Sequence, residues 1–216
     1  MLKSSLDHLV VAIRSLPEGI AEFERLTGIT AGVGGSHPDR GTENALVSLG
    51  PGRYLEIMAP QAGARLAGRD EAMHGLEHLR IIDWAVSVSD VDAAIAVVRR
   101  AGLATRPPRP GSRVTPSGEV LQWTVFGLAD RSLPAAPFFI HWEPGTNHPS
   151  TTAPGGCTLA QLTILDPSPE RLTGVLAALG VEGVTCATGA ARIEARLACR
   201  DKIATLATSS SSQFGF

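Results

Sequence analysis

The stretch Leu6-Asp-His8-Leu-Val-Val-Ala-Ile13 decides the fold, because it is a short apolar run whose pattern returns twice along the chain. The parallel stretches are Ile82-Asp-Trp84-Ala-Val-Ser-Val88 and Leu159-Ala-Gln161-Leu-Thr-Ile-Leu165, at intervals of roughly 76 residues. Each run precedes a helix start, about ten residues with helical periodicity, and a glycine. The chain is therefore predicted to contain three units of similar build.

The ends of the expected helices carry residues that satisfy free backbone groups. Ser15 and Ser89 are predicted N-caps, each with an acidic residue three positions further on, and Pro169 suits a first turn. Each helix is expected to end at a glycine in the left-handed conformation, namely Gly28, Gly102 and Gly180.

After each expected helix the pattern changes to period two, in short strands bounded by Gly or Pro. Each unit is therefore predicted to be βαβββ, which makes the fold class α+β. The predicted boundaries are unit one 1–60, linker 61–79, unit two 80–144, linker 145–156, unit three 157–208 and a low-complexity tail 209–216.

Composition limits the classes of function. The 216 residues include 19 Lys and Arg and 21 Asp and Glu, a net charge of -2, which argues against nucleic-acid binding. Hydrophobic residues make up 44% and charged residues 19%, which excludes a largely disordered chain. No apolar run approaches the length of a membrane span, and the run after His8 is too short for a secretion signal. A cytoplasmic protein without membrane or nucleic-acid partners is expected.

The three cysteines are Cys157, Cys186 and Cys199, and they form no CxxC pair that would suggest a structural zinc site. All three cannot pair within one chain. Reduced thiols are expected, with Cys186 and Cys199 acting as small apolar residues.

The repeat and its polar residues resemble the vicinal oxygen chelate superfamily, in particular its glyoxalase-like domain branch. The stretches that carry the resemblance are Leu6-Asp-His8-Leu-Val-Val-Ala, Gly34-Gly-Ser-His37-Pro-Asp-Arg-Gly41-Thr42-Glu-Asn44-Ala-Leu, Tyr54-Leu-Glu56-Ile and Pro137-Phe-Phe-Ile-His141-Trp142. The resemblance covers roughly residues 5–150; unit three shares only the order of elements. It implies that units one and two form a half-open barrel of mixed β-sheet around a central metal ion.

Strand alternation then predicts which side chains face the cup of this barrel. His8, Glu56 and His141 are each expected on the concave side, opposite residues suited to packing under a helix. Two imidazoles and a carboxylate suit Fe, Mn, Ni or Zn. Such an ion would bind neighbouring oxygens of a small molecule and stabilise developing negative charge.

Other residues are expected to complete the site. Glu143 is the candidate base, His37 and Asn44 are candidate polar contacts, and Tyr54 and Phe139 are candidate aromatic contacts. In unit two, Trp84 occupies the position equivalent to His8, where the resemblance would lead one to expect a metal ligand. It is expected to form an apolar wall or to stack on a flat substrate.

The arginines of Arg106-Pro-Pro-Arg-Pro-Gly-Ser-Arg113 could bind an anionic substrate, or they could belong to a solvated loop.

Two functions from different classes remain open at this point. The first is a metal-dependent lyase, isomerase or dioxygenase acting on a small oxygenated molecule. The second is a metal-free protein that sequesters a small hydrophobic compound among Trp84, Phe139 and Tyr54. Unit three carries no ligands and is expected to be structural, bracing the barrel or pairing with another subunit. The odd number of units suggests a homodimer.

Overall fold

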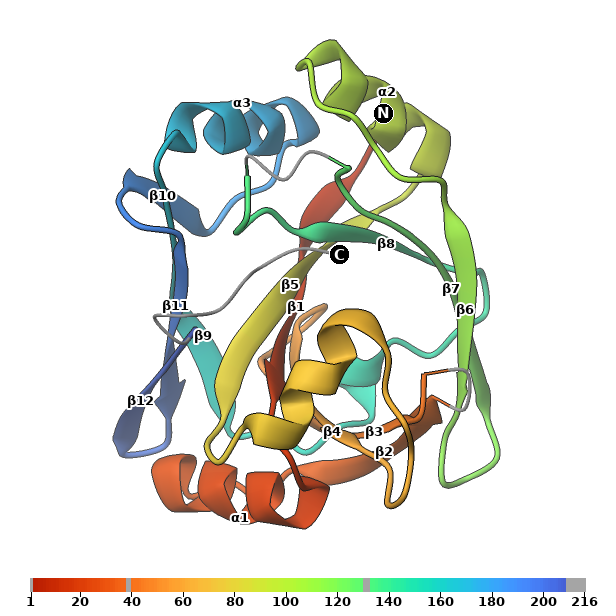
Figure 1. Ribbon diagram of the computed structural model, residues 1–216, viewed down its shortest axis with the longest axis vertical. Helices are drawn as coiled ribbons and strands as arrows, with labels where there is room; N and C mark the ends of the chain where they lie inside the picture. Colours follow the sequence, from red (N-terminus) through yellow and green to blue (C-terminus); the bar gives the residue numbers. More distant parts are fainter. Residues whose placement is uncertain (1, 38–39, 130–132, 209–216) are drawn as a thin grey trace.

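A computed structural model describes residues 2–37, 40–129 and 133–208 (Figure 1). Unit one consists of β1 (Ser4–Ala12), α1 (Leu16–Thr27), β2 (Gly32–His37), β3 (Thr42–Ser48) and β4 (Tyr54–Pro60), followed by the 3-10 helix η1 (Gly68–Gly75). Unit two consists of β5 (Arg80–Val88), α2 (Val91–Arg100), β6 (Arg109–Val114), β7 (Val120–Phe126) and β8 (Phe138–Trp142), followed by η2 (Pro149–Thr151). Unit three consists of β9 (Cys157–Asp166), α3 (Pro169–Leu179), β10 (Val184–Thr188), β11 (Arg192–Cys199) and β12 (Lys202–Ala207). The predicted tail 209–216 lies outside the described residues.

Units one and two form one barrel, in the strand order β1-β4-β3-β2-β6-β7-β8-β5. In each unit the first and last strands are parallel neighbours, β1 with β4 and β5 with β8. The barrel closes between β2 and β6 through a single paired position, Ser36 with Val114. The predicted α+β fold with tandem βαβββ units is confirmed.

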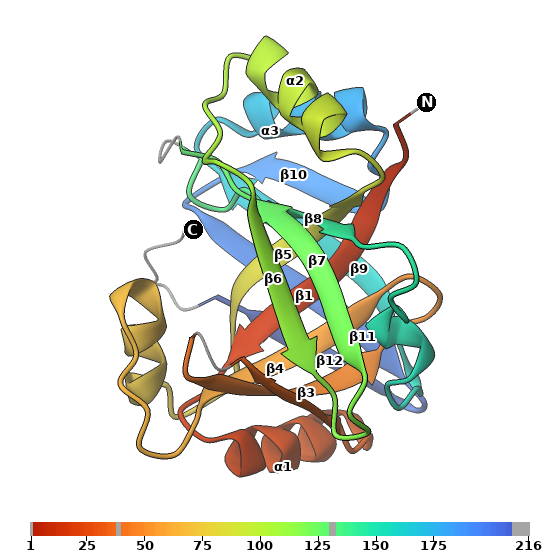
Figure 2. The same cartoon turned by 90° about the vertical axis from the view of Figure 1, so that its right-hand side faces the viewer.

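Unit three has the predicted order of elements but a different strand order. Its sheet runs β10-β9-β11-β12, so that β9 is parallel to β10, whereas β1 is parallel to the last strand of its own unit. The sheet lies against the outside of β1 and β5, and α3 lies beside α2 at one end (Figures 1 and 2). Unit three thus packs against the outside of the barrel.

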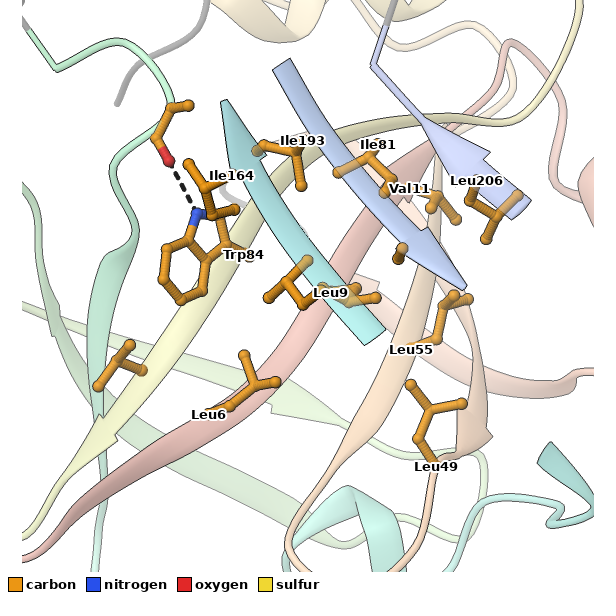
Figure 3. Close-up of a cluster of buried hydrophobic side chains, with 14 of the residues drawn as sticks. Leu6, Leu9, Val11, Leu49, Leu55, Ile81, Trp84, Ile164, Ile193 and Leu206 are labelled. Carbon is orange, nitrogen blue, oxygen red and sulfur yellow. Dashed lines mark hydrogen bonds between the residues drawn. The ribbon is translucent and has the colours of Figure 1, made fainter. Parts of the chain in front are cut away.

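The core has two parts, separated by the wall of the barrel. The larger part lies between the outer face of the barrel, the helices and the sheet of unit three; Leu9, Trp84 and Ile164 meet there (Figure 3). The smaller part fills the barrel interior, and its members are Val10, Ala12, Met58, Leu66, Met73, Ala85, Phe138 and Ile140. Leu9 and Val10 therefore mark the two faces of β1.

The helix ends follow the prediction at the glycines and depart from it at the caps. Gly28, Gly102 and Gly180 all adopt positive φ, at 76°, 76° and 72°. Ser15 stands at the N-cap of α1 but makes no side-chain cap bond. The cap of α2 is Asp90, whose carboxylate accepts from the Ala93 amide at 2.9 Å, so Ser89 was the wrong residue.

The prediction of reduced thiols is wrong for two of the three cysteines. Cys157 and Cys199 form a disulfide, because β9 and β11 place them directly opposite each other with Cα atoms 4.0 Å apart. Cys186 is free. The helices in the described part of the chain are too short or too polar to cross a bilayer.

Candidate functional site

A β-bulge in β1 brings two adjacent polar side chains into the barrel. The pairing of β1 with β5 shifts between Leu6 and His8, which leaves Asp7 as the additional residue. His8 stacks on Tyr54 at 4.4 Å between ring centroids and meets the edge of Phe138 at 5.3 Å. Strict alternation would place Leu6 on the same face as His8, but Leu6 belongs to the outer core.

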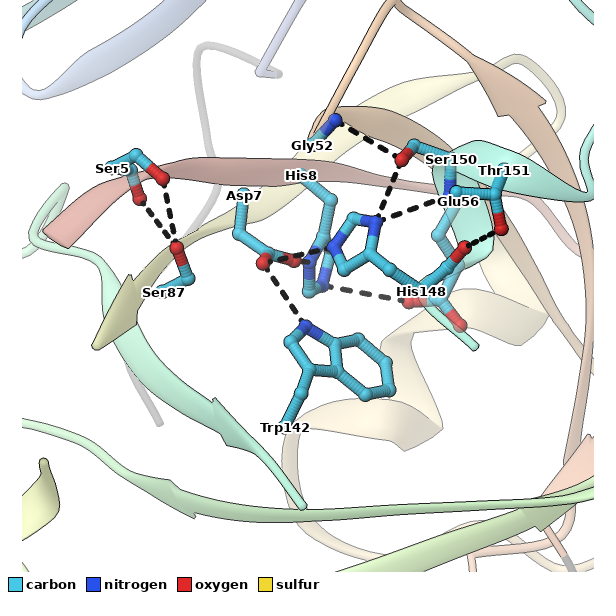
Figure 4. Close-up of polar contacts among 10 residues, drawn as sticks. All are labelled: Ser5, Asp7, His8, Gly52, Glu56, Ser87, Trp142, His148, Ser150 and Thr151. Atoms are coloured by element: carbon cyan, nitrogen blue, oxygen red, sulfur yellow. Dashed lines mark hydrogen bonds and ion pairs between the residues drawn. The ribbon is translucent and has the colours of Figure 1, made fainter. Parts of the chain in front are cut away.

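Asp7 fixes the orientation of His8 (Figure 4). One carboxylate oxygen contacts His8 Nδ1, and the other accepts from Trp142 Nε1 at 3.0 Å and from His148 Nε2 at 3.2 Å. Burial alone would raise the pKa of Asp7, but the hydrogen bonds from His148 and His8 outweigh it and lower that pKa to about 2. An ionised carboxylate only accepts, so Nδ1 is the protonated nitrogen of His8 on this side, and Nε2 faces the site.

His148 completes this arrangement from the linker after β8. Its Nδ1 accepts from the Ser150 amide at 3.2 Å, which leaves Nε2 to donate to Asp7. The Ser150 hydroxyl lies 2.8 Å from the same Nδ1 and accepts from the Gly52 amide at 3.1 Å. The linker is thus tied both to the bulge in β1 and to the β3–β4 turn.

Glu56 of β4 lies opposite His8 and is held in place by Asn44. Asn44 Nδ2 donates to Glu56 Oε1 at 2.6 Å. The two Glu56 oxygens face two imidazoles, His8 Nε2 at 4.0 Å from Oε2 and His37 Nε2 at 3.8 Å from Oε1. Burial would raise the pKa of Glu56, but the nearby histidines and the bond from Asn44 lower it overall, so this carboxyl is ionised near neutral pH.

His37, at the end of β2, is the second imidazole of the cluster. Burial lowers its pKa, which favours the neutral ring near neutral pH. Its Nδ1 lies 3.1 Å from the Thr42 hydroxyl. The ring also meets the edge of Trp123 at 6.3 Å, and Trp123 in turn meets Trp142 at 5.5 Å. Both tryptophans are partly buried and pack against the apolar residues of the interior.

His141 and Glu143 do not belong to this cluster, and the predicted trio is wrong at this point. In β8, Phe138 and Ile140 face the interior, so His141 lies on the opposite face with its Nδ1 2.9 Å from the Val88 carbonyl oxygen. Glu143 accepts from the Thr124 hydroxyl at 3.1 Å instead of reaching the cup. Phe138 and Ile140 pair with Ala85 and Ser87 of β5 and take the interior positions of β8, so alternation turns His141 outward.

Trp84 and Phe139 are also placed differently from the prediction. Trp84 is fully buried in the outer core, where its indole donates to the Ala135 carbonyl at 2.8 Å (Figure 3). Phe139 stacks on Phe126 at 4.6 Å in the same core. The residue that pairs with His8 on the neighbouring strand β5 is Ala85, because of the bulge.

The structure therefore joins His8, Glu56, His37, Asn44 and Tyr54, all from unit one. Tyr54 lies beneath His8, and burial raises the pKa of its hydroxyl well above the usual value. Sequence reasoning missed Asp7 and His148; an aspartate directly before a strand histidine was the available signal for the first.

The donor types in this cluster fit a divalent ion, although the side chains as they stand are too widely spaced. Ligand atoms bind such ions at about 2.0–2.2 Å, so two of them lie roughly 3 Å apart. The N···O distances of 3.8 and 4.0 Å are longer than this, and among the described residues no group of three His, Cys, Asp or Glu side chains meets metal-binding geometry. Each of the two N···O distances exceeds that spacing by about 1 Å.

Fold and site together define a member of the vicinal oxygen chelate superfamily. Residues 6–180 match the family model described as a glyoxalase-like domain, and the chain belongs to this family.

Solved structures resemble this chain at low sequence identity. A hypothetical protein from Staphylococcus aureus is 14% identical with a TM-score of 0.63, over 98% of this chain and 88% of that chain. Methylmalonyl-CoA epimerase from Mycobacterium tuberculosis is 19% identical with a TM-score of 0.47, over 65% of this chain and 87% of that chain. A comparison with curated proteins gave no match. At 14% identity the likeness to the Staphylococcus aureus protein concerns the fold alone.

Proposed function

We propose that this protein is a metal-dependent enzyme, a lyase, an isomerase or a dioxygenase, that acts on a small oxygenated molecule inside the barrel. His8, Glu56 and His37 would hold a divalent Fe, Mn, Ni or Zn ion. One observation carries the proposal: each oxygen of the ionised Glu56 faces an imidazole Nε2, at 4.0 and 3.8 Å. His37 thus takes the place that the sequence suggested for His141.

When bound, the ion would supply Lewis-acid stabilisation of negative charge on the substrate oxygens. The chain's own residues prepare the site for this chemistry. Asp7 keeps the proton of His8 on Nδ1 and so directs Nε2 towards Glu56, as carboxylates behind ligand histidines do. Asn44 fixes the position of Glu56 through a 2.6 Å hydrogen bond. The rings of Trp123 and Trp142, which lie beside His37 and Asp7, would help to exclude water from the site.

Metal analysis of wild-type protein and two histidine variants tests the proposal. His141→Ala is the matched control, because His141 is a histidine of the same barrel that faces away from the interior. Wild type and His141→Ala should bind one of Fe, Mn, Ni or Zn and unfold at a higher temperature with it. At a metal concentration of a hundred times Kd the gain is about 2.7 kcal/mol. His8→Ala should lose both effects. Equal loss in His141→Ala, or no stabilisation of wild type by any of the four metals, would contradict the proposal.

The second candidate is a metal-free protein that binds small apolar molecules. It is favoured by the half of the interior that unit two supplies, because Ala85, Phe138 and Ile140 offer no ligand atoms. Binding would then involve Trp123 and Trp142 and quench their fluorescence without any metal. Aromatic compounds that quench chelator-treated protein, together with a negative metal analysis, would favour this function.

A further inference from the structure

A second charged group, Arg113, lies inside the barrel beside Asn44. Arg113 comes from β6 of unit two, and only 4% of its surface is exposed. The sequence left it between an anion-binding role and a solvated loop, and the structure buries it. Among the described residues, its guanidinium makes one hydrogen bond, from Nη1 to Asn44 Oδ1 at 2.8 Å. No carboxylate of the described residues lies within ion-pair distance of its guanidinium.

Strand β2 leaves room for this side chain through two glycines. A Cβ on Gly34 would stand 2.3 Å from Arg113 Nη1 and 2.4 Å from Asn44 Oδ1. A Cβ on Gly35, whose φ is 138°, would stand 3.3 Å from Arg113 Cγ. The guanidinium can therefore pass closely over β2 only because neither residue carries a side chain.

Most of the hydrogen-bonding capacity of Arg113 is unused within the described chain. A guanidinium offers five N–H donors in a planar fork, and one of them is occupied here. Buried charges in proteins are normally paired, because removal from water is costly for an unpaired ion. If Arg113 served only to hold Asn44 in place, one neutral hydrogen-bond donor would be enough at this position. A buried fork with free donors therefore suits an anion that arrives with the ligand.

We propose that Arg113 binds the carboxylate of the substrate, so that the site takes small organic acids. Which end of the bound acid would react rests on the proposed function, whereas binding of the acid to Arg113 does not. Asn44 bridges Glu56 to Arg113, through bonds of 2.6 and 2.8 Å. An acid seated on Arg113 would therefore present its neighbouring oxygenated carbon towards Glu56 and His8.

The first test uses wild-type protein alone. Glycolate, lactate and pyruvate are titrated by calorimetry and in thermal unfolding, beside their methyl esters and inorganic phosphate. At least one of the acids should bind and raise the melting temperature, and its ester should bind roughly thirtyfold more weakly or not at all. Esters that bind as well as the acids, no binding of any acid, or tighter binding of phosphate would each overturn the proposal.

The second test uses variants of β6. Arg113→Gln should weaken binding of the acid roughly thirtyfold, and Arg113→Lys should restore only part of it because the fork is lost. Arg109→Gln is the matched control, since Arg109 lies exposed on the same strand, and it should bind like wild type. Equal loss in Arg109→Gln would overturn the proposal. If wild type binds no metal while the acid still binds through Arg113, the proposed enzyme function fails and the acid site stands.

Discussion

Asp7→Asn should remove a pH-dependent part of the stability of this fold. The pKa of Asp7 is lowered from 3.8 to about 2 in the folded protein, because His148 and His8 bond to its carboxylate. A lowered folded-state pKa stabilises the fold above the unfolded value near 4, and this stability is lost as the pH falls through 2. The difference corresponds to about 2 kcal/mol at neutral pH.

Urea unfolding of wild type and Asp7→Asn at pH 7 and at pH 2 measures this contribution. At pH 7 the variant should be less stable by about 2 kcal/mol or more, because the amide cannot accept from all three donors. At pH 2 the difference in stability between variant and wild type should narrow, since the wild-type carboxyl is then about half protonated in the folded protein and almost fully protonated in the unfolded chain. Asp92→Asn, at an exposed position of α2, should show no comparable change between the two pH values. An equal difference in unfolding free energy between wild type and Asp7→Asn at both pH values would refute the reasoning.

Further predictions concern the backbone and the crosslink. Gly34→Ala should destabilise the fold by about 1–3 kcal/mol, because the new Cβ would meet Arg113 and Asn44; unfolding curves equal to wild type would contradict this. Replacing Cys157 and Cys199 by Ser should lower stability by up to about 4 kcal/mol, given the 42-residue separation, and thiol titration of unfolded, unreduced wild type should find one free thiol. Asp90→Ala should cost about 1 kcal/mol in urea unfolding through loss of the α2 cap.

Periodicity and repetition predicted the order of elements well, because they report which face of each strand and helix is apolar. They failed where the backbone departs from regular geometry. The bulge at Asp7 turns His8 away from the face of Leu6, and it sets Ala85, not Trp84, opposite His8. Alternation cannot reveal such a shift, because one extra residue inverts every later assignment.

The error at His141 has a related cause. Matching side-chain types between the repeats made His141 the counterpart of Glu56, whereas the residues of β8 that face the interior are Phe138 and Ile140. The position of Arg113 could not be predicted either, since its burial depends on β2 and β6 lying side by side where the two units join. Contacts of this kind join units far apart in sequence, and a pattern within one segment carries no information about them.

A crystal of the protein soaked with Mn would test the central claim most directly, by the position of the anomalous signal. The account predicts a peak within about 2–2.5 Å of His8 Nε2, His37 Nε2 and a Glu56 oxygen, with those side chains drawn together from their 3.8 and 4.0 Å separations. A peak at His141, or an interior that takes up no metal while the His8 and Glu56 side chains stay in place, would contradict it.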